Sequence, residues 1–486
     1  MLDLPVGRTA PRLGAKVRAL RRQEGLSQVQ MAERLSISAS YLNLIEANKR
    51  PLTANLLIHL AHAFKVDLKV FAPEEDLRLS EDLMEAFGDP LFEALELPAS
   101  EVRELTQSCP FLARAVFLLY QSYREARRLH ETLTDRLSDG QGMAPQTTPL
   151  GPEAVADFIQ RSMNHFPELE EASEQLWKSA GLEQDLLYGG LIAAFKKLGV
   201  TVRILRTGEE PGILRHFDPD EGVLSLSELL PMRSRTFQLA HQWALLVLGD
   251  TLDRLTEDPL LAGPVAHSLA RVALANYFAG AVLMPYRPFL RATRAARYDV
   301  ELLSRRFQAG FEQVCHRLTT LRRPGEVGIP FHFSRIDIAG NISKSFSASG
   351  IRFARYSGCC PRWNIHAAFL TPGLIRTQIS EMPDGRKYFC IARTLQKETG
   401  NYRGQHAIQA VGLGCEIGHA REMVYADGLV LEQPPVPVGV TCRLCERMDC
   451  EQRAFPPLQQ VLNIEEDVRR SSFYAHLEPG NGKHRG

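Results

Sequence analysis

The sequence predicts a multidomain protein with an α-helical N-terminal half, followed by two α+β regions. Three observations carry this prediction. The chain has 486 residues, more than one domain usually holds. Residues 12–66 have the pattern of short helices with tight connections, and apolar residues recur at helical spacing through 78–138. Strand-like runs mix with helical segments after residue 153 and dominate from 325 to 460.

Composition limits the class of protein. Hydrophobic residues make up 44% of the chain and charged residues 23%, which is typical of a folded globular protein. No apolar run reaches the roughly 18 to 20 residues of a membrane span, and the first residues, MLDLPVGRTAPRL, lack the apolar region of a signal peptide. We therefore expect a cytoplasmic protein that does not engage a membrane.

The domain boundaries follow from these patterns. A stretch rich in Gly, Pro, Ser and Thr, SDGQGMAPQTTPLGP, has no periodicity and indicates a linker. We expect a domain of short helices at 10–70, a helical connecting or dimerisation segment at 71–137, this linker at 138–152, an α+β domain at 153–295, a C-terminal α+β domain with a cysteine cluster at 296–475, and a flexible tail at 476–486.

Charge is unevenly distributed, although the chain has 57 basic and 57 acidic residues. Residues 1–66 contain ten Lys and Arg against four acids, whereas residues 67–150 contain eight against sixteen. Phosphates attract the first segment and are repelled by the second. The pattern favours binding of nucleic acid by the N-terminal segment.

The first 66 residues contain a helix-turn-helix pattern. Ser27 can cap a helix with Gln30 at its third position, in the manner of a capping box. Residues 36–38 supply a tight turn and a second cap. The predicted inner faces carry Met31, Ala32 and Leu35 on the first helix and Leu42 and Ile45 on the second.

The second of these helices is the predicted recognition helix. In this motif its N-terminal part enters the major groove and the first helix crosses the backbone. The predicted DNA-binding residues are Gln28, Ser38, Ser40, Tyr41, Asn43, Leu44, Asn48, Lys49 and Arg50. Asn43 and Ser40 can read base edges, and Leu44 can contact a thymine methyl group. The segment resembles the Xre/Cro-type helix-turn-helix; the alternative is a small helical bundle with solvated charges.

Residues 235–290 resemble the ImmA/IrrE metallopeptidase family. Its helix carries His-Glu-x-x-His, and a later helix supplies a third ligand before Ala-Asn. Here the helix has His241 followed by Gln242, with Leu245 as the second ligand position and Leu274 as the third. A lone imidazole does not hold catalytic zinc and an amide does not act as a base. We expect the fold without the chemistry, so no catalytic residues and no enzyme.

Three of the nine cysteines lie within nine residues, as Cys442, Cys445 and Cys450. Nearby arginines can offset the charge of thiolates. Zinc and a [4Fe–4S] cluster each take four ligands. Cys415, His419 or a non-protein ligand are the candidates for the fourth position, and three reduced thiols in a proline-rich loop are the alternative.

Over residues 10–475 the chain resembles the short-chain fatty acyl transcriptional regulators. The most specific stretches are RTFQLA, the run at 336–369, VYADGL and CRLCERMDCEQRAFPP. The resemblance implies that an acyl-CoA such as propionyl-CoA or acetyl-CoA is sensed, and that the clustered cysteines bind an iron–sulfur cluster of the 4Fe–4S type. It also implies control of propionate, acetate, methylcitrate or glyoxylate metabolism.

The run at 336–369 carries the candidate ligand-binding residues Lys344, Arg352, Phe353, Arg355 and Trp363. The basic side chains can pair with the phosphates of coenzyme A and the aromatic rings can pack on its adenine or pantetheine. The alternative is a solvated basic edge.

These features predict a transcriptional regulator that binds a double-stranded operator as a homodimer or higher oligomer, because one small domain buries too little surface for tight specific binding. One alternative is a redox- or iron-sensing transcription factor without an acyl ligand. The other is a metallopeptidase that cleaves a repressor.

Overall fold

The structure is a computed structural model, and it describes residues 13–47, 49–64, 73–95, 97–138, 151–206, 212–261, 263–354, 359–397, 407–447 and 450–456. The chain forms two compact units. The first comprises residues 1–145, 355–357 and 441–486, and the second comprises 146–354 and 358–440. Within the described ranges, no helix combines the length and apolar character that crossing a membrane requires.

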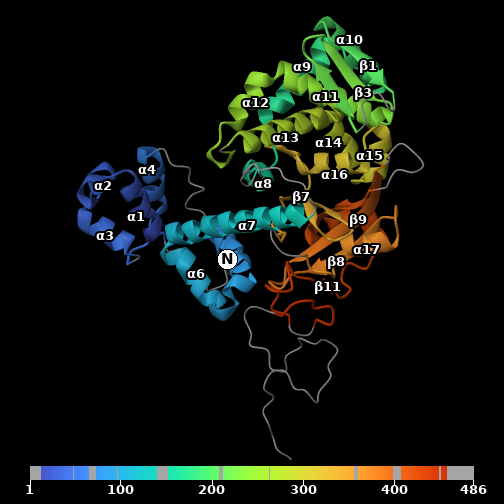
Figure 1. The fold of residues 1–486 in the computed structure, drawn as a ribbon. Coiled ribbons are helices and arrows are strands. Elements are labelled where there is room, and N and C mark those ends of the chain that lie inside the picture. Colours follow the sequence, from blue (N-terminus) through green and yellow to red (C-terminus); the bar gives the residue numbers. More distant parts are fainter. Residues whose placement is uncertain are drawn as a thin grey trace, which may run out of the picture. The chain divides into compact units, whose positions relative to one another are not determined.

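The first unit begins with four short helices (Figure 1). They are α1 (Gly14–Gln23), α2 (Gln28–Arg34), α3 (Ala39–Glu46) and α4 (Ala54–Phe64). All four contribute to one apolar core, in which Met31, Leu42 and Leu60 are fully buried. The predicted inner faces of α2 and α3 are therefore confirmed.

Three further helices and a 3₁₀ turn follow in the same unit. They are α5 (Pro73–Phe87), η2 (Pro90–Leu95), α6 (Ala99–Ser108) and α7 (Pro110–Ser138). Leu83, Val102 and Phe117 form the centre of their core. Only part of the apolar pattern predicted for 78–138 is buried in this core. Leu112 is 56% exposed and Leu119 is 71% exposed, so these side chains of α7 face away from the core.

The second unit begins with helices and a small sheet. Its elements are α8 (Gly151–Arg161), α9 (Pro167–Ala180), η3 (Gln184–Leu186), α10 (Leu187–Lys197), β1 (Thr201–Leu205), β2 (Arg215–Asp218), β3 (Val223–Ser227), α11 (Met232–Val247), α12 (Gly249–Thr256), η4 (Pro259–Leu261), α13 (Pro264–Leu283), α14 (Tyr286–Ala295), α15 (Val300–Arg306) and α16 (Phe311–Thr319). The strand order is β1-β3-β2, with β1 parallel and β2 antiparallel to β3. The last two residues of the predicted linker, Gly151 and Pro152, begin α8, and residues 139–150 lie outside the described part.

A larger sheet completes the second unit. Its strands are β6 (His332–Asp337), β7 (Ile342–Ser347), β8 (Arg376–Glu381), β9 (Lys387–Lys397), β10 (Ala407–Glu416) and β11 (Val436–Pro437), in the order β11-β8-β9-β10-β6-β7. The short elements around it are β4 (Arg322–Arg323), β5 (Glu326–Val327), α17 (Asn364–Ala367), η5 (Ala368–Leu370), η6 (Ile417–Glu422) and η7 (Val424–Ala426). The predicted fold class, helical first and α+β afterwards, is confirmed (Figure 1).

One core runs through the second unit. Buried side chains from Leu176 to Ala426 form a single apolar cluster. It crosses residue 295, where the sequence pattern placed a boundary between two domains. The two sequence regions therefore fold as one body, because each contributes an apolar surface that the other covers.

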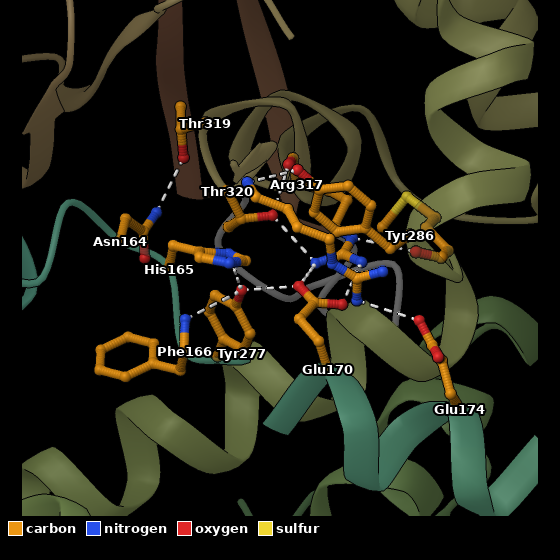
Figure 2. Close-up of polar contacts among 12 residues, drawn as sticks. Asn164, His165, Phe166, Glu170, Glu174, Tyr277, Tyr286, Arg317, Thr319 and Thr320 are labelled. Atoms are coloured by element: carbon orange, nitrogen blue, oxygen red, sulfur yellow. Dashed lines mark hydrogen bonds and ion pairs between the residues drawn. The ribbon is translucent and has the colours of Figure 1, made fainter. Parts of the chain in front are cut away.

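A buried ion pair fastens four helices of this body (Figure 2). Arg317 of α16 donates to both carboxylate oxygens of Glu170 of α9, at 2.6 and 2.9 Å, and both side chains are at most 2% exposed. Tyr277 of α13 donates to the same carboxylate at 2.6 Å. The Arg317 guanidinium also lies 5.7 Å from the ring centre of Tyr286 in α14. Removing either charge would leave the other buried and unpaired.

Candidate DNA-binding surface and effector sites

Side-chain caps fix the helix-turn-helix. The Ser27 and Gln30 side chains exchange hydrogen bonds with each other's backbone N–H groups, at 3.3 and 2.9 Å, which completes the predicted capping box. The Tyr41 backbone N–H donates to Ser38 Oγ at 3.1 Å and begins α3. Ser36 between them has φ +55°, so the turn uses the left-handed region. These contacts set the direction of α3 relative to α2.

The predicted DNA contacts divide by their exposure. Ser40, Asn43, Leu44, Lys49 and Arg50 are exposed. Tyr41 is half-buried against the core, so much of its ring packs inside the domain. Asn48 lies outside the described residues.

Gln28 is half-buried on α2, next to the recognition helix. Its side-chain amide donates to Asn43 Oδ1 at 3.3 Å. The structure thus brings Gln28 and Asn43 together, and the Asn43 amide N–H₂ is left as the donor for a base edge.

A buried carboxylate behind α3 was not predicted from the sequence. Glu46, with its side chain fully buried, accepts from Arg21 at 2.6 and 3.0 Å and from Gln28 at 2.9 Å. Burial raises the pKa of Glu46, but the hydrogen bonds from Arg21 and Gln28 outweigh it and hold the pKa below its ordinary value. Glu46 therefore connects α1, α2 and α3. The sequence offered one signal for its burial: helical periodicity places the acidic Glu46 on the same face of the helix as the apolar Leu42 and next to Ile45.

The retained histidine of the peptidase-like helix is a buried, neutral group. His241 on α11 is 3% exposed. Its Nδ1 contacts the Arg215 guanidinium of β2, which also donates to Gln238 Oε1 at 3.0 Å. Burial and the Arg215 charge lower the pKa of His241 to about 3. The prediction that His241 packs and hydrogen-bonds agrees with this geometry. Arg215 was missed, because nothing in a short strand signals a partner on α11.

Apolar packing occupies the other two ligand positions. Leu274 of α13 is 1% exposed in a cluster with Leu169 and Phe166, and Leu245 of α11 packs against the same cluster. A metal ion needs polar donors at these two positions. The substitutions therefore exchange two ligands for a hydrophobic contact.

The candidate ligand-binding run does not form one surface. Lys344 of β7 lies opposite Arg335 and two residues from Phe346, so it is on the face of the large sheet that packs on α16. Its ammonium lies 6.0 Å from the Phe333 ring centre, and burial lowers the pKa of Lys344 to about 8.

The two aromatic candidates lie on the other face of that sheet. The rings of Phe353 and Trp363 are 5.5 Å apart, and Trp363 Nε1 donates to the Gly439 carbonyl at 2.9 Å. Trp363 is 8% exposed in a second apolar cluster. Arg352 is half-buried, and Arg355 lies outside the described residues. The sheet separates Lys344 from Phe353 and Trp363, because alternate residues of a strand point to opposite faces.

The cysteine loop belongs to the first unit. Arg453, 7% exposed, donates to the carbonyls of Cys442, Cys445 and Arg447, at 2.5, 2.7 and 2.6 Å. The Ala454 N–H approaches Cys442 Sγ at 3.5 Å. One buried guanidinium therefore holds the backbone of two cysteines and places a positive charge beside their thiols.

The same loop contacts the helical segment. Arg443, between Cys442 and Cys445, donates to the Gly88 carbonyl just after α5, at 3.1 Å. Its guanidinium lies 5.2 Å from the ring centre of Phe455. The loop is thereby joined to the helices that follow the helix-turn-helix.

The side chains proposed as a fourth ligand are occupied elsewhere. Cys415 is fully buried in the core of the second unit, where its thiol contacts Met423 Sδ at 3.7 Å. His419 Nδ1 lies 2.7 Å from Glu422 Oε1. In the described part of the chain, no group of three or more His, Cys, Asp or Glu is arranged around one metal ion. This holds also for Cys442, Cys445 and Cys450, whose thiols are not gathered around one ion in this structure.

Capped helices with an exposed recognition face, attached to a peptidase-like fold without its ligands, define a helix-turn-helix transcriptional regulator. Comparisons with known families agree with this class. Residues 17–71 match the helix-turn-helix family, residues 195–319 match the IrrE N-terminal-like domain, and residues 320–474 match the C-terminal region of short-chain fatty acyl coenzyme A regulators.

Similar proteins cover nearly the whole chain. "HTH-type transcriptional regulator PrpR" of Mycobacterium tuberculosis is 38% identical over 98% of both chains, and "Propionyl-CoA carboxylase regulator" of Cereibacter sphaeroides is 38% identical over 94% of this chain and 96% of the relative. A solved structure, "Mycobacterium tuberculosis transcriptional regulator", is 42% identical with a TM-score of 0.65 and covers 68% of this chain and 100% of that one. The chain belongs to the short-chain fatty acyl coenzyme A regulator family. The relatives are regulators, which agrees with the prediction of a non-enzyme.

Proposed function

We propose that this chain is a transcription factor whose affinity for its operator is set by a short-chain acyl-CoA, and that it controls genes of propionate or acetate metabolism. The observation that carries the proposal is the pairing of an exposed recognition face with a peptidase-like body. Ser40, Asn43 and Leu44 are exposed on α3, whereas Leu245 and Leu274 stand where the second body would need metal ligands. Such a body offers a ligand site without catalysis. The names of the relatives support the metabolic assignment.

We infer that the protein acts as a homodimer or higher oligomer through α7. Leu112, Leu119 and Tyr123 lie seven and four residues apart, on one side of the helix, and are 56%, 71% and 37% exposed. Large apolar side chains grouped on a helix are typical of a protein interface. A second copy would cover them and bring two recognition helices to one operator.

We propose that Cys442, Cys445 and Cys450 hold an iron–sulfur cluster of the 4Fe–4S type. The donor set suits it: three thiols in one loop, a buried Arg453 that offsets their charge, and an N–H aimed at Cys442 Sγ. When bound, the cluster would cross-link the three cysteines, so the stability of the loop would depend on iron and on redox state. Anaerobic preparation should give brown protein, and Cys445→Ser should lose iron and sulfide together. Colourless anaerobic protein with tightly bound zinc would contradict this assignment.

The experiment for the acyl-CoA proposal is an operator titration. The operator is first selected from random DNA by the purified protein, and its affinity is then measured by fluorescence anisotropy with free, acetyl-, propionyl- and longer acyl-CoAs. A ligand shifts the equilibrium only if it prefers one DNA-binding state. We expect propionyl-CoA or a close relative to change the affinity at least several-fold. A response to oxidation alone, flat across all acyl-CoAs, would instead favour the redox- or iron-sensing alternative.

A further inference from the structure

The helix-turn-helix contains a network of side-chain hydrogen bonds that ends on the exposed face of α3. It begins at Arg21 on α1, whose guanidinium donates to both carboxylate oxygens of Glu46, at 2.6 and 3.0 Å. Gln28 on α2 donates to Glu46 Oε2 at 2.9 Å and to Asn43 Oδ1 at 3.3 Å. The network therefore connects a buried charge pair to Asn43, which is exposed on the predicted recognition face.

The buried carboxylate sets the direction of each hydrogen bond in this network. Burial opposes ionisation of Glu46, but the hydrogen bonds from Arg21 and Gln28 outweigh it and hold the pKa of Glu46 below its ordinary value. An ionised carboxylate can only accept hydrogen bonds. Gln28 must therefore turn its amide N–H₂ group toward Glu46, and the second hydrogen of that group is donated to Asn43.

Asn43 is oriented by its bond to Gln28. The end amide of an asparagine can usually turn by half a rotation, which exchanges its oxygen and nitrogen. Here that rotation would place the N–H₂ group of Asn43 against the N–H₂ group of Gln28, so two donors would face each other. In the part of the chain that the structure describes, no hydrogen bond within the protein uses the Asn43 N–H₂ group. Asn43 is thus held with its donor free.

The orientation of this amide matters because the bases present different groups in the major groove. Adenine and guanine share the acceptor N7, cytosine presents the N4–H₂ donor, and thymine places a methyl group beside its O4 acceptor. A fixed N–H₂ donor matches the N7 atom of a purine. Opposite cytosine it would meet another donor, and both groups would lose their hydrogen bonds to water without a replacement.

We propose that Glu46 is a positioning residue for base recognition: through Gln28 it holds Asn43 as a hydrogen-bond donor, and Asn43 thereby selects a purine over cytosine in the operator. Glu46 touches no DNA itself, because its side chain is fully buried. The inference rests on the proposed binding of an operator and does not depend on the acyl-CoA response. It adds the class of base that the recognition helix reads.

The test measures how strongly the protein discriminates between bases. The operator is selected from random DNA, and the contacted position is the one at which Asn43→Ala loses the preference of the wild type. Operators with the preferred purine, its 7-deaza analogue or cytosine at this position are titrated by fluorescence anisotropy, with and without propionyl-CoA. The analogue has a C–H group in place of N7. We expect the full-length wild-type protein to bind the analogue about threefold, and the cytosine operator about tenfold, more weakly.

Two variants break the network at different points. Glu46→Gln and Gln28→Ala should each reduce the loss of affinity at cytosine to about threefold or less, because Asn43 can then turn its oxygen toward the cytosine N4–H₂ group. Gln28→Ala leaves the pair of Arg21 and Glu46 intact, so it tests the network without unpairing a buried charge. Glu33→Gln is the matched control, since Glu33 is an exposed acid on α2, and it should keep the wild-type discrimination. Thermal unfolding verifies that each variant is folded.

The outcomes separate this inference from the proposed function. If no operator is selected from random DNA, both are wrong. If an operator is selected but the 7-deaza analogue binds as tightly as the purine, Asn43 does not donate to N7 and only the inference is wrong. If Gln28→Ala keeps the full loss of affinity at cytosine, the network does not orient Asn43, and the inference is wrong whatever Glu46→Gln does. Reduced discrimination in both variants, with the control unchanged, supports it.

Discussion

The helix-turn-helix and the IrrE-like region each contain a motif of known chemistry, and they have diverged in opposite ways. In the first, the caps at Ser27 and Ser38 and the exposed Asn43 provide what DNA recognition requires. In the second, His241 is kept, but Arg215 is its partner and leucines fill the other ligand positions. The comparison teaches that apolar packing and a hydrogen-bonded pair can occupy the positions of metal ligands within a fold of the peptidase type.

Breaking the buried ion pair should have the largest effect. Arg317→Met leaves the Glu170 carboxylate buried without a counter-charge, which should cost about 3–5 kcal/mol of stability. Thermal and urea unfolding of the full-length chain measure it. The control, Arg317→Met with Glu170→Leu, should recover most of the loss. If the double variant is as unstable as the single one, packing of the arginine matters more than its charge.

The same pair should make stability depend on acidic pH. Burial raises the pKa of Glu170, but the Arg317 charge and hydrogen bonds outweigh it and hold the pKa below its ordinary value of 4.5. The pair's stabilisation is therefore complete above about pH 4.5 and is lost as the pH falls through the lower pKa of the folded state.

In the helix-turn-helix, Asn43→Ala should test sequence recognition. Loss of a base-edge contact should cost roughly 1–3 kcal/mol at the operator and little on non-specific DNA. Anisotropy on both DNAs measures the difference. Lys49→Ala is the comparison, because loss of a phosphate contact weakens both DNAs alike. Equal losses for Asn43→Ala on both DNAs would show that Asn43 only positions the backbone.

In the IrrE-like region, His241→Gln should test whether the remaining histidine binds a metal ion or only packs inside the fold. Elemental analysis should find no stoichiometric zinc bound through His241, so the wild-type protein and the variant should have the same zinc content. Because the pKa of His241 falls from 6.5 to about 3 on folding, wild-type stability should decrease by up to about 1.4 kcal/mol per pH unit as the pH falls below 6.5. The variant should lack this part of the pH dependence. Zinc that disappears in the variant would restore the metal-site hypothesis.

The smallest expected effect is at a cap. Ser38→Ala removes the acceptor for the Tyr41 N–H, which should destabilise α3 by about 1 kcal/mol and weaken operator binding in proportion. Ser40→Ala on the same helix is the control for stability, because the Ser40 side chain is exposed and caps nothing. Local hydrogen exchange in α3 measures both variants. Equal protection of the α3 amides from hydrogen exchange in Ser38→Ala and Ser40→Ala would show that the cap does not limit the opening of α3.

The sequence by itself determined what is local. The caps at Ser27 and Ser38 and the buried face of Leu42 and Ile45 depend on spacing within a few turns of helix, so periodicity exposed them. The absence of ligands at Leu245 and Leu274 followed from the resemblance of the sequence to the ImmA/IrrE family. The tertiary structure decided what joins distant segments. Arg215 meets His241, Glu170 meets Arg317, and the cysteine loop meets Gly88 across long stretches of chain. It also separated Lys344 from Trp363, because the face of a strand is set by its register with partners that spacing alone does not reveal.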